Sequence, residues 1–573
     1  MTHTTINLYP ASLKTLDGTK WGYINKKGEL VSKPLFDYAM DFQENGLAVV
    51  ERYNKYGIIN ERGKYVVKPQ FLSISEFSEG RAVVLDYDGY HVINEQGKIL
   101  TTKPYSFIGS YQDKRALFSL NENNQLLYGY LDLEGNEIIP ASFLSASDFL
   151  NGQAIIQKDD QTSALLNQSG QVLYTYPYPT VTNLGEGLLS FKESSEFDAK
   201  VGVMDTKGTV ILSPRYTWIQ PFKDRRAIIT VAEEYRNPYG LIDTKGNVVI
   251  QPIYNDIQLL GETRVALGKA IKEEEPYKGS YYAIADNVGR LLTDFIYTSV
   301  LPFEENVASA SDSKRTFFIN KDGRQATGLP VLKGSGTLAF EGDLIKATIN
   351  QRVSYYSREG KEIWKQNSVI PLNRHYLVKE KKYNPREDYV VYYPQIEGMT
   401  NTTTQRKVND QLKKMSQEQK IDNDELQDYT YSADFNVEFF KGILLVLKLE
   451  AYQYPIGAAH GMPFKNYPHI NLKTGKFYQL EDLFKNNQEY IKVLSDIIGN
   501  QIKNDPTYSY VFPDAYKGIS KDQPFYVSSD ALYLYFAPYE IAPYAAGFPT
   551  FKIYYKEISD ILNKQGEFWR SFH

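Results

Sequence analysis

Short apolar runs separated by turn residues fill roughly the first two thirds of the chain. The runs YGLI and NVVI, for example, lie on either side of the turn segment that begins at Asp243 and ends at Gly246. Asp or Asn at the first position and Gly at the fourth is typical of a type I β-turn, and a glycine there can take positive φ. The pattern predicts a β-hairpin.

The same turn recurs about ten times along this part of the chain, and a repeat of a few dozen residues is typical of solenoids and propellers. Five of the copies have their first and fourth positions at Asn25 and Gly28, Asn60 and Gly63, Asp132 and Gly135, Asp205 and Gly208, and Asp243 and Gly246.

Each hairpin is followed by a proline, an aromatic residue and a third short apolar run, as in KPQF and GRAVVL after Gly63. Proline cannot donate to a strand ladder and therefore ends the strand. A lone hairpin is marginal in water, so the units must stack on one another. We predict a mainly β tandem-repeat array of about ten three-stranded units over residues 15–372. Such a number would make an unusually large ring, which favours an open superhelix over a closed propeller-like array.

An aromatic–glycine pair opens the first strand of several hairpins, as at Trp21–Gly22, Tyr56–Gly57 and Tyr239–Gly240. We expect the ring to pack on a neighbouring strand and the glycine to permit close backbone approach. With these pairs, the strings KWGYINKKGELV and KYGIINERGKYVVKPQF resemble the WG (KWG) repeat of bacterial proteins. The resemblance implies a β-rich array and covers roughly residues 15–370.

The second half follows a different pattern after a mixed-charge stretch at residues 373–386, which we interpret as a linker. Val408, Leu412 and Met415 share one face of a predicted helix, and YSADFNVEFF alternates as a strand with one buried face does. We predict a smaller α+β domain over residues 387–565, a lead-in over 1–14 and a tail over 566–573.

Three strings in this domain carry a second resemblance: YYPQIEGMTNTTTQRKVNDQLK, YPIGAAHGMPFKNYPHINLKTGKFYQLEDLF and FYVSSDALYLYFAPYEIAPYAAGFPTFKIYY. They resemble the extracytoplasmic domain of RsiV-type anti-sigma factors and the non-catalytic region of PdaC-type peptidoglycan deacetylases. The resemblance implies a receptor-like role near the cell wall, because the RsiV branch is a receptor for lysozyme. Anti-sigma activity is not implied, since the chain shows neither a transmembrane helix nor a sigma-binding segment.

Composition narrows the possible functions. A net charge of −5 argues against a nucleic-acid partner, which needs a basic surface. The chain has no cysteine, so disulfides, thiolate metal sites and a cysteine nucleophile are excluded. No apolar run is long enough to span a membrane. The given N-terminus lacks the features of a secretory signal, which predicts a cytoplasmic location, or an extracytoplasmic one if the N-terminus is truncated. Oligomeric state is not predicted.

Motifs of catalysis are missing from the sequence. There is no closely spaced histidine pair for a metal, no nucleophile elbow, no P-loop and no dinucleotide fingerprint. His460 and His469 are separated by two prolines and cannot share a helical face. We therefore expect no enzymatic activity, no metal and no cofactor.

Three residues are candidates for binding: His460, Tyr539 and Tyr544. His460 follows small residues in GAAHG, and it either bonds backbone in a buried crossing or contacts a partner. Tyr539 and Tyr544 lie in a loop held by Pro538 and Pro543, where they either pack on the loop or form rigid contacts with a protein or sugar.

These observations predict a non-enzymatic interaction protein of bacterial type. The array would present a binding surface, and the C-terminal domain would be a receptor-like module for a cell-envelope protein such as lysozyme, or for a wall glycan. One alternative is a carbohydrate-active hydrolase or deacetylase whose carboxylates converge only in three dimensions. A second alternative is an intracellular scaffold.

Overall fold

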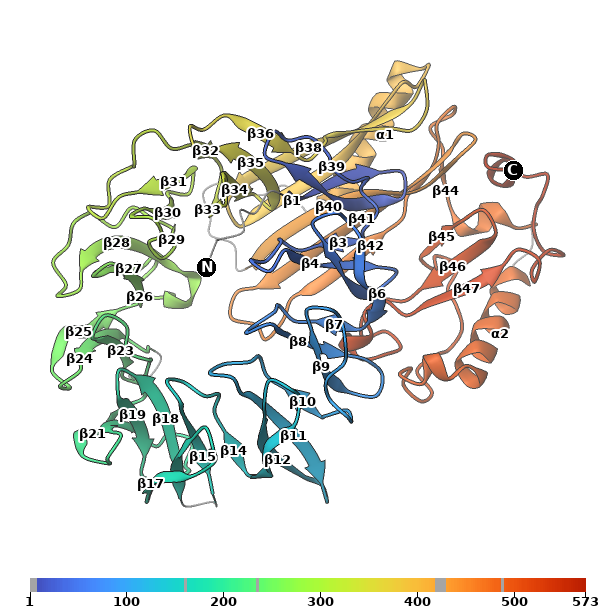
Figure 1. Ribbon diagram of the computed structural model, residues 1–573. Helices are drawn as coiled ribbons and strands as arrows, with labels where there is room; N and C mark the ends of the chain where they lie inside the picture. The colour runs from blue at the N-terminus through green and yellow to red at the C-terminus, as the bar shows by residue number, and fades with distance from the viewer. Residues whose placement is uncertain (1–7, 159–161, 233–235, 418–428, 486–488) are drawn as a thin grey trace. The chain divides into compact units, whose positions relative to one another are not determined.

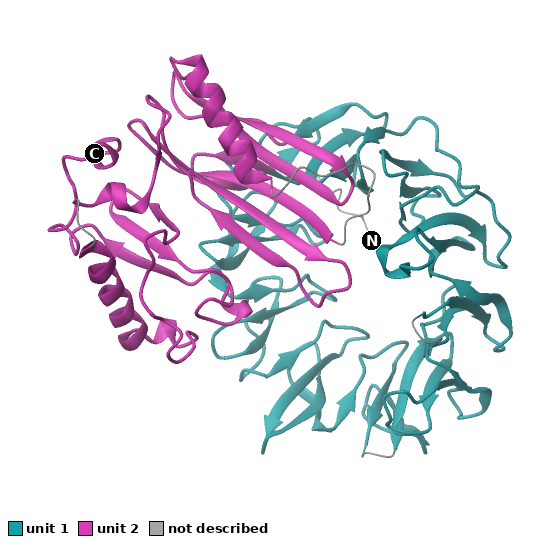
Figure 2. Ribbon diagram, turned by 180° about the vertical axis from the view of Figure 1, so that it is seen from behind, with its two compact units in different colours: residues 1–11, 21–365 teal, residues 12–20, 366–573 magenta. Residues whose placement is uncertain are grey.

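The computed structural model describes residues 8–158, 162–232, 236–417, 429–485 and 489–573. Over these residues the chain forms ten small antiparallel sheets in tandem, followed by a large mixed sheet and a three-stranded sheet (Figure 1). It divides into two compact units, which are coloured separately in Figure 2. The array unit comprises residues 1–11 and 21–365, and the C-terminal unit comprises residues 12–20 and 366–573.

The first five sheets are β1–β2 (Leu8–Thr15, Gly18–Asn25), β3–β6 (Tyr38–Ala39, Leu47–Arg52, Lys55–Asn60, Tyr65–Phe71), β7–β9 (Ser73–Ile74, Arg81–Leu85, Tyr90–Asn94), β10–β13 (Phe107–Ile108, Ala116–Glu122, Gln125–Leu131, Glu137–Phe143) and β14–β17 (Ser145–Ala146, Gln153–Gln157, Ser163–Asn167, Val172–Tyr176). The next five are β18–β21 (Thr180–Gly185, Leu188–Lys192, Val201–Asp205, Val210–Tyr216), β22–β25 (Trp218–Ile219, Arg226–Thr230, Tyr239–Asp243, Val248–Tyr254), β26–β28 (Asp256–Gly261, Arg264–Ala270, Ser280–Asp286), β29–β32 (Ser299–Val300, Ala308–Ser311, Arg315–Ile319, Val331–Lys333) and β33–β36 (Gly336–Glu341, Leu344–Ile349, Arg352–Ser357, Glu362–Lys365). A 3-10 helix, η1 (Pro276–Lys278), lies between β27 and β28.

Most sheets have one strand more than the three expected from the sequence. The additional strand comes first in the sheet and is often only two residues long, as in β3, β10 and β14. Two residues are too few to show an alternating pattern, which is why the sequence did not reveal this strand.

The recurring Asx-x-x-Gly segment forms the turn between the last two strands in most four-stranded sheets, and in the first sheet it follows β2. In the second sheet the Oδ1 atom of Asn60 accepts from the backbone N–H of Arg62 at 3.0 Å and of Lys64 at 3.1 Å. The backbone N–H of Gly63 donates to the carbonyl oxygen of Asn60 at 2.8 Å, and Gly63 has a φ of 70°. The same turn is found at the other four predicted pairs, Asn25 and Gly28, Asp132 and Gly135, Asp205 and Gly208, and Asp243 and Gly246.

The glycine of the aromatic–glycine pair lies against the last strand of its sheet. A Cβ atom on Gly57 would lie 2.6 Å from the carbonyl oxygen of Val67, and one on Gly240 would lie 2.6 Å from that of Ile250. The pairing of β5 with β6 shifts register at this point, which brings the carbonyl over the glycine. No larger residue fits there without movement of the backbone.

Neighbouring sheets are joined by a contact that repeats around the array. In each case an arginine stands before or at the start of the second strand of one sheet. Its Nε donates to a backbone carbonyl oxygen in the next sheet, that of the residue directly after the Asx of the Asx-x-x-Gly turn. The pairs are Arg81 with Leu133, Arg115 with Gln168, Arg226 with Asn287 and Arg264 with Lys321. Each contact is a charge-assisted hydrogen bond to a turn that the repeat itself supplies.

Contacts within the array unit join its last sheet to its first strands. The Tyr355 hydroxyl donates to the carbonyl oxygen of Pro10 at 2.9 Å, the backbone N–H of Asp343 donates to the Tyr9 hydroxyl at 3.3 Å, and Lys26 pairs with Asp343 at 3.4 Å. The array is therefore closed into a propeller-like ring, not open as the repeat number suggested (Figure 1). Spacing along the chain determines strand length but not the angle between successive sheets, so it could not decide closure.

The C-terminal unit combines two sheets with three α-helices among the described residues. The large sheet contains β37 (Val369–Pro371), β38 (Leu377–Arg386), β39 (Tyr389–Glu397), β40 (Tyr429–Lys441), β41 (Leu444–Pro455), β42 (Met462–Asn466), β43 (His469–Asn471) and β44 (Phe477–Tyr478). The small sheet contains β45 (Phe525–Val527), β46 (Ala531–Tyr535) and β47 (Thr550–Tyr554). The helices are α1 (Thr402–Ser416), α2 (Glu489–Asn504) and α3 (Glu567–Arg570), with 3-10 helices η2 (Leu480–Leu483), η3 (Pro506–Tyr508) and η4 (Tyr544–Ala546).

The predicted helix and strand of this unit pack together. Val408 and Leu412 of α1 are buried in one core with Phe435 and Val437 of β40. Asn401 caps the helix, because its side chain accepts from the backbone N–H of Thr404 at 2.9 Å. None of the helices in the described part of the chain has the length and apolar character that crossing a membrane requires.

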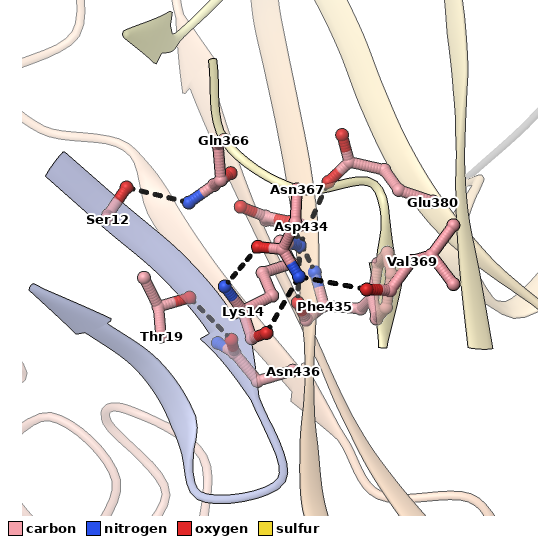
Figure 3. Close-up of polar contacts among 10 residues, drawn as sticks. All are labelled: Ser12, Lys14, Thr19, Gln366, Asn367, Val369, Glu380, Asp434, Phe435 and Asn436. Carbon is pink, nitrogen blue, oxygen red and sulfur yellow. Dashed lines mark hydrogen bonds and ion pairs between the residues drawn. The ribbon is translucent and has the colours of Figure 1, made fainter. Parts of the chain in front are cut away.

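The tip of the β1–β2 hairpin belongs to the C-terminal unit, although it comes from the opposite end of the sequence (Figure 3). Lys14 is 2% exposed, and its ammonium lies 2.6 Å from the carboxylate of Asp434 and 3.1 Å from that of Glu380. It also donates to the carbonyl oxygen of Phe435 at 2.7 Å. Asn367 bonds both the N–H and the carbonyl oxygen of Lys14, much as a neighbouring strand would.

Several segments contain more structure than their predicted roles suggested. The lead-in contains most of β1, the segment interpreted as a linker contains β38, and the tail contains α3 with Phe568 and Phe572 buried in the core. Residues 1–7 of the lead-in lie outside the described residues.

Candidate binding site on the C-terminal unit

His460, Tyr539 and Tyr544 come together on the surface of the C-terminal unit. The β41–β42 hairpin brings His460 to its connecting loop, and the connection between β46 and β47 carries both tyrosines. The ring of His460 stacks on that of Tyr544 with 4.1 Å between centroids, and the rings of Tyr539 and Tyr544 are 5.7 Å apart. His460 is exposed, so the interpretation that it is buried in a backbone crossing is wrong.

Hydrogen bonds determine which groups of this aromatic cluster face outward. His460 Nδ1 lies 3.0 Å from the carbonyl oxygen of Gly461, so in this contact Nδ1 carries the hydrogen. In the neutral ring Nε2 is then an acceptor, and the Tyr539 hydroxyl donates to it at 3.1 Å. The Tyr544 hydroxyl donates to the same Gly461 carbonyl at 2.9 Å. Both hydroxyl hydrogens are used internally, and the surface offers oxygen lone pairs and ring faces.

Tyr539 has a strained backbone in addition to its exposed side chain. Its φ is 69°, in the left-handed region, and 51% of the residue is exposed. Bulky residues rarely adopt this conformation, and such strain is concentrated at functional sites. An exposed tyrosine in an unfavourable backbone conformation does not stabilise the fold, and we interpret it as a candidate for binding.

Two supporting residues of the cluster were not singled out in the sequence. The Tyr452 hydroxyl accepts from the backbone N–H of Gly461 at 2.9 Å. A Cβ atom on Gly461 would lie 2.4 Å from the carbonyl oxygen of Gln453, so only glycine fits beside this strand. The glycine after the histidine in GAAHG was the available signal. Burial first, and then hydrogen bonding with Tyr452, raises the pKa of Tyr544 above its ordinary value.

Different protein families match the two halves of the chain. A model described as "WG containing repeat" matches residues 21–56, 56–90, 128–161, 202–231 and 239–259. A model described as "Protein of unknown function (DUF3298)" matches residues 481–556. The chain carries WG repeats and a DUF3298 domain. The matches confirm the two recognised families, and the sheets described above confirm a mainly β tandem array followed by an α+β domain.

Solved structures similar to the chain include two DUF3298-family proteins and BamB. The protein from Bacteroides fragilis is 16% identical, with 33% of this chain and 93% of that chain covered and a TM-score of 0.25. The protein from Pseudomonas aeruginosa is 18% identical, with 34% and 95% covered and a TM-score of 0.25. BamB from Moraxella catarrhalis is 13% identical, with 50% and 94% covered and a TM-score of 0.28. A search of curated proteins finds no match.

The DUF3298 match includes Tyr539 and Tyr544 but begins at residue 481, after His460. The candidate site therefore combines a loop of the matched segment with a hairpin that precedes it.

The other histidine of this region has a different environment. His469 is buried, and its ring stacks on Phe525 with 4.2 Å between centroids. Burial lowers the pKa of His469 to about 3, so it is neutral and part of the core. Among the described residues, no group of three His, Asp or Glu side chains is arranged to hold a metal ion.

A polar cavity of 490 Å³ in the DUF3298 region contains several carboxylates. Lys476 pairs with Asp482 at 2.8 Å, and Lys521 pairs with Glu481 at 3.1 Å. Two of the carboxylates that line this cavity are therefore engaged by lysine ammonium groups.

Proposed function

We propose that this protein is a non-enzymatic binding protein of the bacterial cell envelope, and that its DUF3298 domain recognises a basic protein of the lysozyme kind. The exposed cluster of His460, Tyr539 and Tyr544 is the observation that carries the proposal. The WG-repeat ring provides a second binding surface.

The chemistry of the cluster favours a cationic partner over a neutral sugar. The two tyrosine hydroxyls donate inward, which leaves acceptor oxygens and ring faces on the outside. Arginine and lysine side chains bind to aromatic faces and to such oxygens, with about 0.5–2 kcal/mol for each cation–π contact. Tyrosine is also enriched among the residues that dominate protein interfaces.

The resemblance to RsiV-type receptors supports the same partner class. That family's receptor branch binds lysozyme, which is basic and acts on the cell wall. The strings that carry the resemblance include the loops of His460 and of both tyrosines.

The test is a calorimetric titration of the full chain with purified lysozyme. The full chain is needed because residues 12–20 belong to the C-terminal unit. We expect saturable binding that Tyr539→Gly weakens by at least about tenfold, or ~1.4 kcal/mol. Glycine removes the ring and relieves the positive φ, so the variant should fold at least as well as the parent protein.

Tyr554→Ala is the matched control, because Tyr554 is an exposed tyrosine of the same unit outside the cluster. It should change lysozyme affinity by less than about twofold. Lysozyme binding that survives Tyr539→Gly would place the partner on another surface. Binding of soluble wall glycan instead of lysozyme would assign the site to a sugar.

A further inference from the structure

The turn between β4 and β5, in the second sheet of the array, carries an unexpected tyrosine. Tyr53 and Asn54 have φ values of 56° and 57°, which is the type I′ geometry of a two-residue hairpin turn. Other hairpins of the array have the same turn, among them those with the pairs Asn123–Asn124, Glu262–Thr263 and Asn350–Gln351. Asn, Asp and Gly suit this conformation, whereas tyrosine opposes it. Among the described residues of the array, Tyr53 is the only aromatic residue with a positive φ.

The ring of Tyr53 is displayed to solvent beside a cation. Tyr53 is 77% exposed, and the guanidinium carbon of Arg52 lies 4.9 Å from the ring centroid. Arg52 Nη2 also donates to the Tyr53 hydroxyl at 3.3 Å. The nearby carboxylate of Asp37 is turned to the backbone, where it accepts from the N–H of Tyr53 at 2.7 Å.

Lys55, at the other end of the turn, presents an ammonium covered by an aromatic ring of the next sheet. Its Nζ atom lies 4.1 Å from the ring centroid of Tyr87, which is 84% exposed on the turn between β8 and β9. Within the described residues this Nζ is buried and makes no hydrogen bond. An ammonium has three donors, and a buried donor without an acceptor indicates a missing partner.

We propose that Arg52, Tyr53, Lys55 and Tyr87 form a binding site for an acidic polysaccharide. The carboxylate or sulfate groups of such a chain would pair with Arg52 and, once the exposed Tyr87 ring turns aside, with Lys55. Its sugar rings would lie against the exposed faces of the two tyrosines. Alternating cations and aromatic rings fit a polymer that alternates charge with flat apolar faces. This inference rests on the proposed function in one respect: the proposed function also treats the array as a binding surface.

The experiment is a calorimetric titration of the full chain with hexagalacturonate, with maltohexaose as the neutral probe. We expect hexagalacturonate to bind, maltohexaose not to bind, and the affinity to fall as salt is raised. Tyr53→Asn and Lys55→Met should each weaken binding by about tenfold. Asp88→Asn, which removes a negative charge beside Tyr87, should tighten it.

Melting temperatures of the same variants show whether a loss of binding comes from a lost contact or from a destabilised fold. Tyr53→Asn installs the residue that stands first in the turns Asn123–Asn124 and Asn350–Gln351, so the melting temperature of this variant should equal or exceed that of the parent protein. Tyr277→Asn, at an exposed tyrosine between β27 and β28, is the matched control and should leave hexagalacturonate binding unchanged.

Three results would overturn the site: no binding of hexagalacturonate, equal binding of the neutral sugar, or full affinity in both Tyr53→Asn and Lys55→Met. Tighter binding of polyglutamate than of hexagalacturonate would assign the surface to an acidic protein segment and overturn the polysaccharide. Failure here is distinguishable from failure of the lysozyme proposal, because that titration depends on Tyr539 in the other unit.

Discussion

The two units are held together internally by different kinds of contact. In the array, one modest contact recurs from sheet to sheet, such as the bond from Arg81 to the Leu133 carbonyl and its counterpart from Arg115 to Gln168. In the C-terminal unit, a single buried cation, Lys14, is surrounded by groups from distant parts of the chain. Repetition distributes stability over many equivalent bonds, whereas a buried single-copy ion cluster concentrates it in one side chain.

This difference predicts how the units respond to mutation. The array should tolerate the loss of any one sheet-to-sheet bond, because each repeat contacts its neighbours through many similar groups. The C-terminal unit should be sensitive to the loss of Lys14, because the carboxylates around it would lose a shared counter-ion inside the protein.

The largest expected effect is that of Lys14→Met. Removing one partner of a buried ion pair costs about 3 kcal/mol or more, and the partial exposure of Asp434 favours the lower end. Urea unfolding of the full chain measures the loss. Lys26→Met is the matched control, since Lys26 and Asp343 form an exposed pair in the same hairpin region and should contribute less than about 0.5 kcal/mol. Equal effects of the two substitutions would contradict the contrast between the units.

Substitution of the repeat glycines should reduce stability by an intermediate amount. Comparing two of them tests whether close backbone approach or turn conformation limits the repeat. Gly57→Ala should cost about 2 kcal/mol, because its Cβ would lie 2.6 Å from the Val67 carbonyl oxygen. Gly63→Ala should cost about 1 kcal/mol, because nothing lies within 4 Å of its Cβ and only the positive φ opposes the change. Thermal unfolding compares the two variants directly. The reverse order would mean that turn conformation, not close approach, limits the repeat.

The smallest of these effects belongs to the sheet-to-sheet bond. Arg115→Met should cost about 1 kcal/mol, because methionine keeps the apolar stem and leaves the Gln168 carbonyl without this donor. The control is Arg62→Met at an exposed turn position, which should stay within about 0.5 kcal/mol. A loss from Arg115→Met as large as that from Lys14→Met would show that the array depends on single contacts as much as the C-terminal unit does.

Local signals in the sequence identified much of the array correctly. Asn60 with Gly63 predicts a turn, and Tyr56 with Gly57 predicts a close approach between backbones. Residue type alone was sufficient, because both features depend on backbone geometry within one hairpin. The arginine contacts were not inferred, although an arginine stands before or at the start of the same apolar strand in several repeats, as in GRAVV and RRAII. Their acceptor lies in the next sheet, some fifty residues further along the chain.

The candidate binding site shows the same limit. His460 was recognisable in the sequence from the small residues that precede it, and Tyr539 and Tyr544 were recognisable from the prolines beside them. Their convergence depends on how the β41–β42 hairpin and the β46–β47 connection pack, and the strained φ of Tyr539 and Tyr53 is visible only in three dimensions.

The sequence by itself determined the repeat, its turns, the class of each half and the residues worth testing. These follow from preferences that act over a few neighbouring residues. Only the tertiary structure decided that the array closes, that Lys14 completes the unit at the far end of the chain, and that two tyrosines are displayed against their backbone preference. Those outcomes depend on angles between sheets and on contacts hundreds of residues apart, which no local pattern encodes.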